Sequence, residues 1–177
     1  MTASPNLVLV DGNIGKQGTA ANSVEAAIQQ FGSIDILVSN AGIFYTKPFT
    51  DFTTEDSNAL VSTNLLGFLY ITQFTVQQML KQKSGNVMSV SAALADRPIA
   101  GVNGSVSMMT KGGLNSVIQN LAVAYANDGN ALSFLVTPAC RPLSVGGLPT
   151  NQPSGRARSH RFPQLLRMDF WSGMTCG

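Results

Sequence analysis

Short apolar runs alternate with longer amphipathic stretches over the first 140 residues. The apolar runs span residues 6–10, 34–38, 85–91 and 132–136, and turn-forming residues lie beside each of them. Runs this short, with apolar residues on both faces, are typical of strands buried in a parallel sheet. The longer stretches span residues 19–31, 53–80 and 107–125, and their apolar side chains recur at helical spacing. This alternation predicts an α/β fold with a mostly parallel sheet and helices on both of its sides.

The expected helix over residues 53–80 is apolar nearly all the way round. Such a helix must be covered twice, by its own sheet and by a second surface. Thr53 or Thr54 can begin it, and two acidic residues follow in its first turn. Polar residues interrupt the apolar run from residue 60 to residue 80. We therefore expect a buried or interface helix and no membrane span.

The composition changes near residue 140. Hydrophobic residues make up 44% of the chain and charged residues only 11%. Residues 1–140 hold six basic and eight acidic side chains, whereas residues 141–177 hold five arginines against Asp169 alone. The second region shows no apolar period, so we expect one domain over residues 1–140 and an unstructured or irregular basic tail over residues 141–177. The tail's arginines lack interleaved aromatic residues, so no nucleic-acid partner is expected.

The two cysteines, Cys140 and Cys176, lie late in the chain and lack the spacing of metal ligands. We expect two reduced thiols and no metal site. The first six residues lack the basic and apolar regions of a secretory signal, which favours a cytoplasmic location.

Four segments in a fixed order resemble motifs of the short-chain dehydrogenase/reductase family. They are Asp35–Gly42, Thr63–Gly67, Gly85–Ser91 and Thr110–Asn115. The resemblance covers residues 7–138 and implies a partial Rossmann-like fold, a three-layer α/β/α arrangement. It also implies hydride transfer between NAD or NADP and a small carbonyl or alcohol substrate. Because the family commonly pairs its two long helices, a homo-oligomer is implied as well.

The same resemblance implies a set of catalytic residues. Asn64 matches the family's relay Asn, and Lys111 matches the Lys that holds the nicotinamide ribose. Ser91 and Ala92 occupy the two positions where the family often has a pair of serines. The second of the pair is the more usual catalytic residue, and here it is Ala92. Ser107 stands four residues before Lys111, where the family has its catalytic Tyr, and i, i+4 spacing directs both side chains into one cleft with Ser91 and Asn64. A serine hydroxyl is a weaker acid than a phenol, so Ser107 is expected to bond a substrate rather than to donate the proton.

The cofactor-binding residues that the resemblance implies are Asn13, Asn40, Ala41, Gly42 and Lys111. Asn13 stands where the family has an Asp that contacts adenine, and Asp11 is a nearby alternative. No G-x-G-x-x-G turn precedes residues 6–10, which predicts an N-terminally truncated member with weak dinucleotide binding. Two hypotheses stay open: a weak or inactive oxidoreductase, or a non-catalytic fragment (a pseudoenzyme) that retains a protein-interaction role.

The expected sheet lacks two of the family's strands. The family order is 3-2-1-4-5-6-7, and this chain resembles only strands 3 to 6. Asn6–Val10 would lose its usual neighbours, and Ile34–Val38 would have an open edge. Either Asn6–Val10 shifts to pair with Ile34–Val38, in the order 3-4-5-6, or it stays detached. The helix between them permits a right-handed crossover and favours the shift.

Overall fold

The computed structural model describes residues 6–126, 131–138 and 165–168. Its main elements are α1 Gln17–Phe31, β1 Ile36–Ser39, α2 Thr54–Leu60, α3 Gly67–Gln82, β2 Ser84–Ser91, α4 Ser105–Tyr125, β3 Ala131–Pro138 and β4 Leu165–Met168. A π-helical segment, Val61–Leu66, joins α2 to α3, and short 3-10 turns occupy Phe49–Asp51 and Ala93–Ala95. The helices predicted over residues 19–31, 53–80 and 107–125 are all present.

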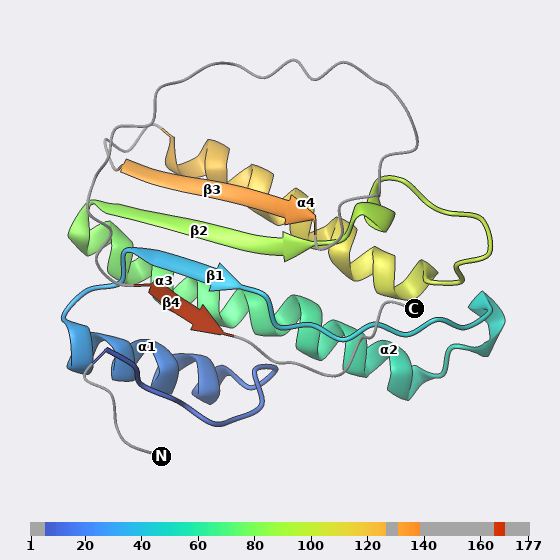
Figure 1. Cartoon of the computed structure of the whole chain (residues 1–177), viewed down its shortest axis with the longest axis horizontal. Coiled ribbons are helices and arrows are strands. Elements are labelled where there is room, and N and C mark those ends of the chain that lie inside the picture. The colour runs from blue at the N-terminus through green and yellow to red at the C-terminus, as the bar shows by residue number, and fades with distance from the viewer. Residues whose placement is uncertain (1–5, 127–130, 139–164, 169–177) are drawn as a thin grey trace.

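The four strands form one parallel sheet in the order β3-β2-β1-β4 (Figure 1). β1 pairs with β2 from Ile36 opposite Asn86 to Ser39 opposite Ser89. β2 pairs with β3 along its whole length. The α/β class with a parallel sheet is therefore confirmed.

The predicted strand at Asn6–Val10 is wrong. Residues 7–10 have no regular structure, and Leu7 and Leu9 are exposed. The open edge of β1 pairs instead with β4, from Ile36 opposite Leu165 to Ser39 opposite Met168. The tail was expected to be unstructured or irregular; its residues 165–168 form β4, and the rest of the tail lies outside the described residues. An open strand edge needs a partner for its backbone N–H and C=O groups, and β4 supplies it.

Helices α3 and α4 lie together on one face of the sheet (Figure 1), and α1 packs against α3. The core that they enclose includes Ala20, Ala27, Leu37, Ile71, Met79, Val87, Leu114 and Ile118. Strand residues that alternate with these point to the opposite face, where Val38, Met88 and Val90 are only half-buried. Of the three predicted layers, the described residues thus show the sheet and one helical layer.

Thr53 is the N-cap of the long helix; the sequence had offered Thr53 or Thr54 for its start. The Asp56 N–H donates to Thr53 Oγ1 at 3.1 Å, and the Asp56 carboxylate accepts from the Thr53 N–H at 3.0 Å, which is a capping box. The helical stretch Thr54–Gln82 is long and apolar enough to cross a membrane by length and composition. However, its Leu60 and Met79 are fully buried inside the protein, as expected of a core helix.

Candidate active site

The carboxyl ends of β1 and β2 lie side by side at one end of the sheet. β1 ends at Ser39 and continues into Asn40–Gly42, which are half-buried, and β2 ends at Ser91. Ligand sites of open parallel sheets form where the carboxyl ends of strands meet the following loops. The Asn-Ala-Gly turn and Ser91 therefore occupy the position where a site is expected.

Asn64 lies in the π-helical segment and is 1% exposed. Its Nδ2 donates to Ile43 O at 3.0 Å and to Thr110 Oγ1 at 2.9 Å, and its Oδ1 accepts from the Ile43 N–H at 2.8 Å. The side chain thus ties the loop after β1 to α4. Thr110, which also donates to Ser107 O at 2.7 Å, was missed by the sequence analysis. Its place directly before Lys111 was the available signal.

Lys111 extends from α4 to the end of β2. Its Nζ donates to Val90 O at 2.8 Å. A Cβ built on Gly42 would lie 3.3 Å from Lys111 Nζ and 3.2 Å from Asn64 Oδ1, so the Asn-Ala-Gly turn passes directly beside both groups. Burial lowers the pKa of Lys111 below its ordinary value, because it disfavours the charged ammonium. An ammonium has three protons to donate, so the bond to Val90 leaves it able to bind a ligand.

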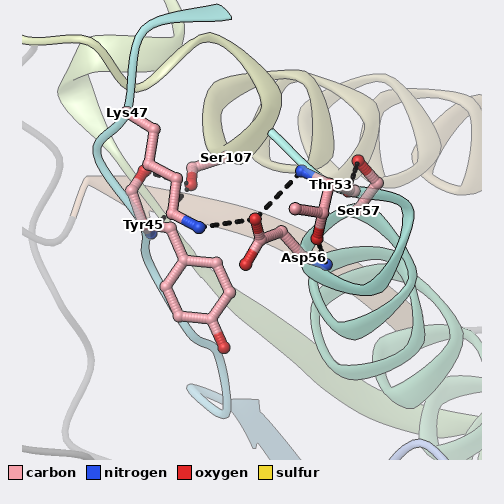
Figure 2. Close-up of polar contacts among 6 residues, drawn as sticks. All are labelled: Tyr45, Lys47, Thr53, Asp56, Ser57 and Ser107. Carbon is pink, nitrogen blue, oxygen red and sulfur yellow. Dashed lines mark hydrogen bonds and ion pairs between the residues drawn. The ribbon is translucent and has the colours of Figure 1, made fainter. Parts of the chain in front are cut away.

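Ser107 lies one turn before Lys111 on the same helix, but its hydroxyl is already engaged. Ser107 Oγ donates to Tyr45 O at 2.9 Å and accepts from the Tyr45 N–H at 3.0 Å, and the residue is 1% exposed. Figure 2 shows Ser107 beside the Tyr45 backbone, with the Tyr45 ring directed away from Ser107. The Ser107 hydroxyl therefore anchors the loop after β1, and its expected contact with a substrate stays a prediction.

Ser91 and Asn13 differ in their surroundings. Ser91 is 2% exposed, and its Oγ has no hydrogen-bond partner among the described residues. Such a buried hydroxyl needs an explanation, and a site where a ligand supplies the partner is one. Asn13 is exposed, and its Oδ1 accepts from the Gly15 N–H at 2.9 Å within a local turn. The structure thus brings Asn64 and Lys111 beside Gly42, and Ser91 directly follows Val90, whose carbonyl accepts from Lys111; Asn13 has a local contact instead.

Replacing Lys111 with methionine should change how stability depends on pH. The unfolded chain keeps the Lys111 proton up to a higher pH than the folded chain, so folding becomes more favourable as pH rises from the lowered pKa towards the ordinary value of 10.5. Relative to Lys111→Met, the parent chain should therefore gain stability across that window. Urea unfolding at several pH values measures this, and Lys81→Met at an exposed position controls for the lost charge. A difference that stays constant with pH would contradict it.

A cavity of about 430 Å³ lies beside the first turn of α4, the helix that carries Lys111. Its walls are the loop after β1 at Lys47 and Phe49, the segment that follows β2 between residues 94 and 104, and the start of α4 at Ser105 and Met108. Met108 lies one turn before Lys111 on α4. A hollow of this volume suits a small molecule. The sequence analysis missed it because its walls come from three separate segments.

Sequence comparisons give the relationships of the chain. The family model described as short chain dehydrogenase matches residues 2–140. An L-rhamnose-1-dehydrogenase from Scheffersomyces stipitis is 33% identical over 125 residues, which cover 70% of this chain and 48% of the relative. A tropinone reductase homolog from Arabidopsis thaliana is 34% identical over 140 residues, which cover 73% of this chain and 53% of the relative. The chain spans about half the length of the curated relatives that it matches.

Solved structures agree with the sequence comparisons. A 3-ketoacyl-(acyl-carrier-protein) reductase from Brucella melitensis, complexed with NADH, superposes with a TM-score of 0.66 at 27% identity. The match covers 72% of this chain and 53% of the reductase. Because the family model spans well over half of the sequence, the chain belongs to the short-chain dehydrogenase family.

Proposed function

We propose that this chain carries the catalytic-helix half of an oxidoreductase that uses NAD or NADP and acts on a small carbonyl or alcohol substrate. The observation that carries the proposal is the half-buried Lys111 ammonium, set between the Asn-Ala-Gly turn and the end of β2. Named relatives include dehydrogenases and reductases, and one structural neighbour is complexed with NADH. The nicotinamide cofactor, when bound, supplies or accepts the hydride.

Each site residue has a proposed role that follows from its contacts. Lys111 would hold the nicotinamide ribose with its remaining ammonium protons, beside Gly42. Ser91 would donate its unpartnered hydroxyl to the substrate oxygen. Asn64 has both amide protons and its oxygen in use, so we propose it as a positioning residue. Asn40 and Ala41 would flank the cofactor, and Asn13 is the proposed adenine contact.

The proposed site lacks the phenol that transfers the proton in the family. With Ser107 bonded to the Tyr45 backbone, we assign proton delivery to Lys111, whose lowered pKa makes it a better acid than an exposed lysine. A missing acid–base group typically costs about 10²–10⁴-fold in rate. The Ser107–Tyr45 contact also supports the second candidate, a non-catalytic member of the family with a protein-interaction role, because it fills the place of the family's phenol.

Calorimetric titration of the 177-residue chain with NADH and with NADPH tests the proposal. We expect weak binding, about tenfold weaker still in Lys111→Met, because a charge-assisted hydrogen bond to the ribose is lost. Lys81→Met is the matched control and should bind like the parent chain. Carbonyl reduction should be barely measurable, and Ser107→Tyr should not restore it, because a phenol does not fit where Ser107 is buried. Equal binding by the parent chain and Lys111→Met would contradict the role of Lys111.

We also propose that the chain self-associates through α3 and α4. Leu69 on α3 and Met109 and Val123 on α4 are 38%, 57% and 75% exposed, although they are large and apolar. Burying such side chains against a second copy is favourable. Sedimentation at micromolar concentration should show a species larger than a monomer, and a clean monomer would contradict the proposal. A cytoplasmic location, with neither a membrane nor nucleic acid as partner, completes it.

A further inference from the structure

The cavity beside the first turn of α4 is bounded mainly by apolar side chains. Phe49, Ile99 and Val102 line it with exposed fractions of 73%, 61% and 40%. Large apolar side chains that stay exposed around a hollow are typical of a ligand site. Lys47 is the charged side chain among the lining residues that the structure describes. Whether the cavity favours a charged ligand therefore depends on which group is paired with the Lys47 ammonium.

The Lys47 ammonium is already paired with a fixed carboxylate. Its Nζ lies 2.6 Å from Asp56 Oδ2, and Asp56 is held in turn by the capping box with Thr53 (Figure 2). The hydrogen bond from Lys47 holds the pKa of Asp56 below its usual value, so the carboxylate stays charged at neutral pH. The Asp56 charge thus neutralises the Lys47 ammonium and would repel an anionic ligand placed beside it.

The two loops around the cavity are joined to each other. The Lys47 N–H donates to Asn103 O at 2.9 Å. The Phe44 ring approaches Gly104 so closely that a Cβ there would lie 3.1 Å from Phe44 Cε2. These contacts hold the cavity open and fix the backbone of Lys47. The hollow is therefore formed before any ligand arrives.

We propose that this cavity binds an uncharged, mainly apolar ketone or alcohol, and that Asp56 sets this preference by neutralising the charge of the Lys47 ammonium. A sugar would place most of its hydroxyl groups against apolar walls, because Asn103 and Ser105 are the uncharged polar side chains among the described lining residues. A carboxylate would compete with Asp56. That the bound compound is also the one reduced or oxidised rests on the proposed function, whereas the binding preference does not.

Three probes of similar size test the preference without any cofactor: cyclohexyl methyl ketone, cyclohexanecarboxylate and L-rhamnose. Titrations of the ¹⁵N-labelled full chain are followed through the backbone amide signals of Ile99, Val102 and Met108. We expect the ketone to shift these signals and to bind at least about tenfold more tightly than the carboxylate or the sugar. A preference for the carboxylate or the sugar, or no shift at these amides with the ketone, would overturn the proposal.

Asp56→Asn frees the Lys47 ammonium and keeps an oxygen that can accept from the Thr53 N–H. We expect this variant to bind cyclohexanecarboxylate about three- to fivefold more tightly, a gain lost at high salt, with the ketone unchanged. Glu55→Gln removes one negative charge from an exposed position in the same helical turn, and it should change neither affinity. Equal gains in both variants, or none in Asp56→Asn, would overturn the role of Asp56. Because nicotinamide binding and Lys111 play no part here, the result is independent of the NADH titration.

Discussion

Replacing Asn64 with alanine should lower the free energy of unfolding by about 2–4 kcal/mol. The side chain is 1% exposed and bonds the N–H and C=O of Ile43 as well as Thr110 Oγ1. Without it, the N–H and C=O of Ile43 lose this partner, and Thr110 Oγ1 keeps only its bond to Ser107 O. Urea unfolding followed by circular dichroism measures the change.

Two further variants separate these bonds from other effects. Asn64→Asp preserves the size of the side chain but cannot donate to Ile43 O, so it should not restore the stability. Asn58→Ala, at an exposed position in α2, should change the unfolding free energy by less than about 0.5 kcal/mol. If Asn64→Ala unfolds like the parent chain, the network has no energetic importance.

Ending the chain after residue 164 should both destabilise the protein and make it aggregate. The truncation removes β4 and leaves the backbone groups of Ile36–Ser39 without their partner strand. Losing the hydrogen bonds of a four-residue strand should cost about 2–4 kcal/mol, and an open edge pairs readily with a second chain. Urea unfolding at low protein concentration measures the first effect, and light scattering at rising concentration measures the second.

A chain ended after residue 168 is the matched control, because it loses the following residues but keeps β4. It should unfold like the full chain and stay dispersed. If both truncated chains behave alike, the pairing of β4 with β1 contributes nothing to stability. If the shorter chain alone aggregates, the edge of β1 is the cause.

The helices and three of the four strands could be predicted because local pattern determines them. The start of α2 follows from the capping box of Thr53 and Asp56, and the end of α1 follows from Gly32, whose φ of 79° a glycine adopts without strain. The strand at Asn6–Val10 was wrong because an apolar run becomes a strand only when an edge is available. Which segment takes the edge of β1 depends on contacts between residues about 130 apart in the sequence, and no local pattern in Leu165–Met168 reveals them.

The site shows the same division between local and distant information. Asn64 and Lys111 could be found because they lie in recognisable segments, and the structure brings both beside Gly42. The engagement of Ser107 could not be predicted, because its partner is the backbone of Tyr45, 62 residues away. The sequence revealed that a phenol is missing on α4, and only the fold shows what occupies its place.

The π-helical segment Val61–Leu66 depends on the number of residues between α2 and α3. A π-helical turn holds about one residue more than an α-helical turn, so the extra residue bulges while α2 and α3 keep their own faces toward the core. Deleting a single residue there would let the segment close into a regular α-helix without moving either neighbour far. The widened turn that presents Asn64 to Ile43 would then be gone. Loss or gain of one codon at this point could therefore remove or create the site while the surrounding fold persists.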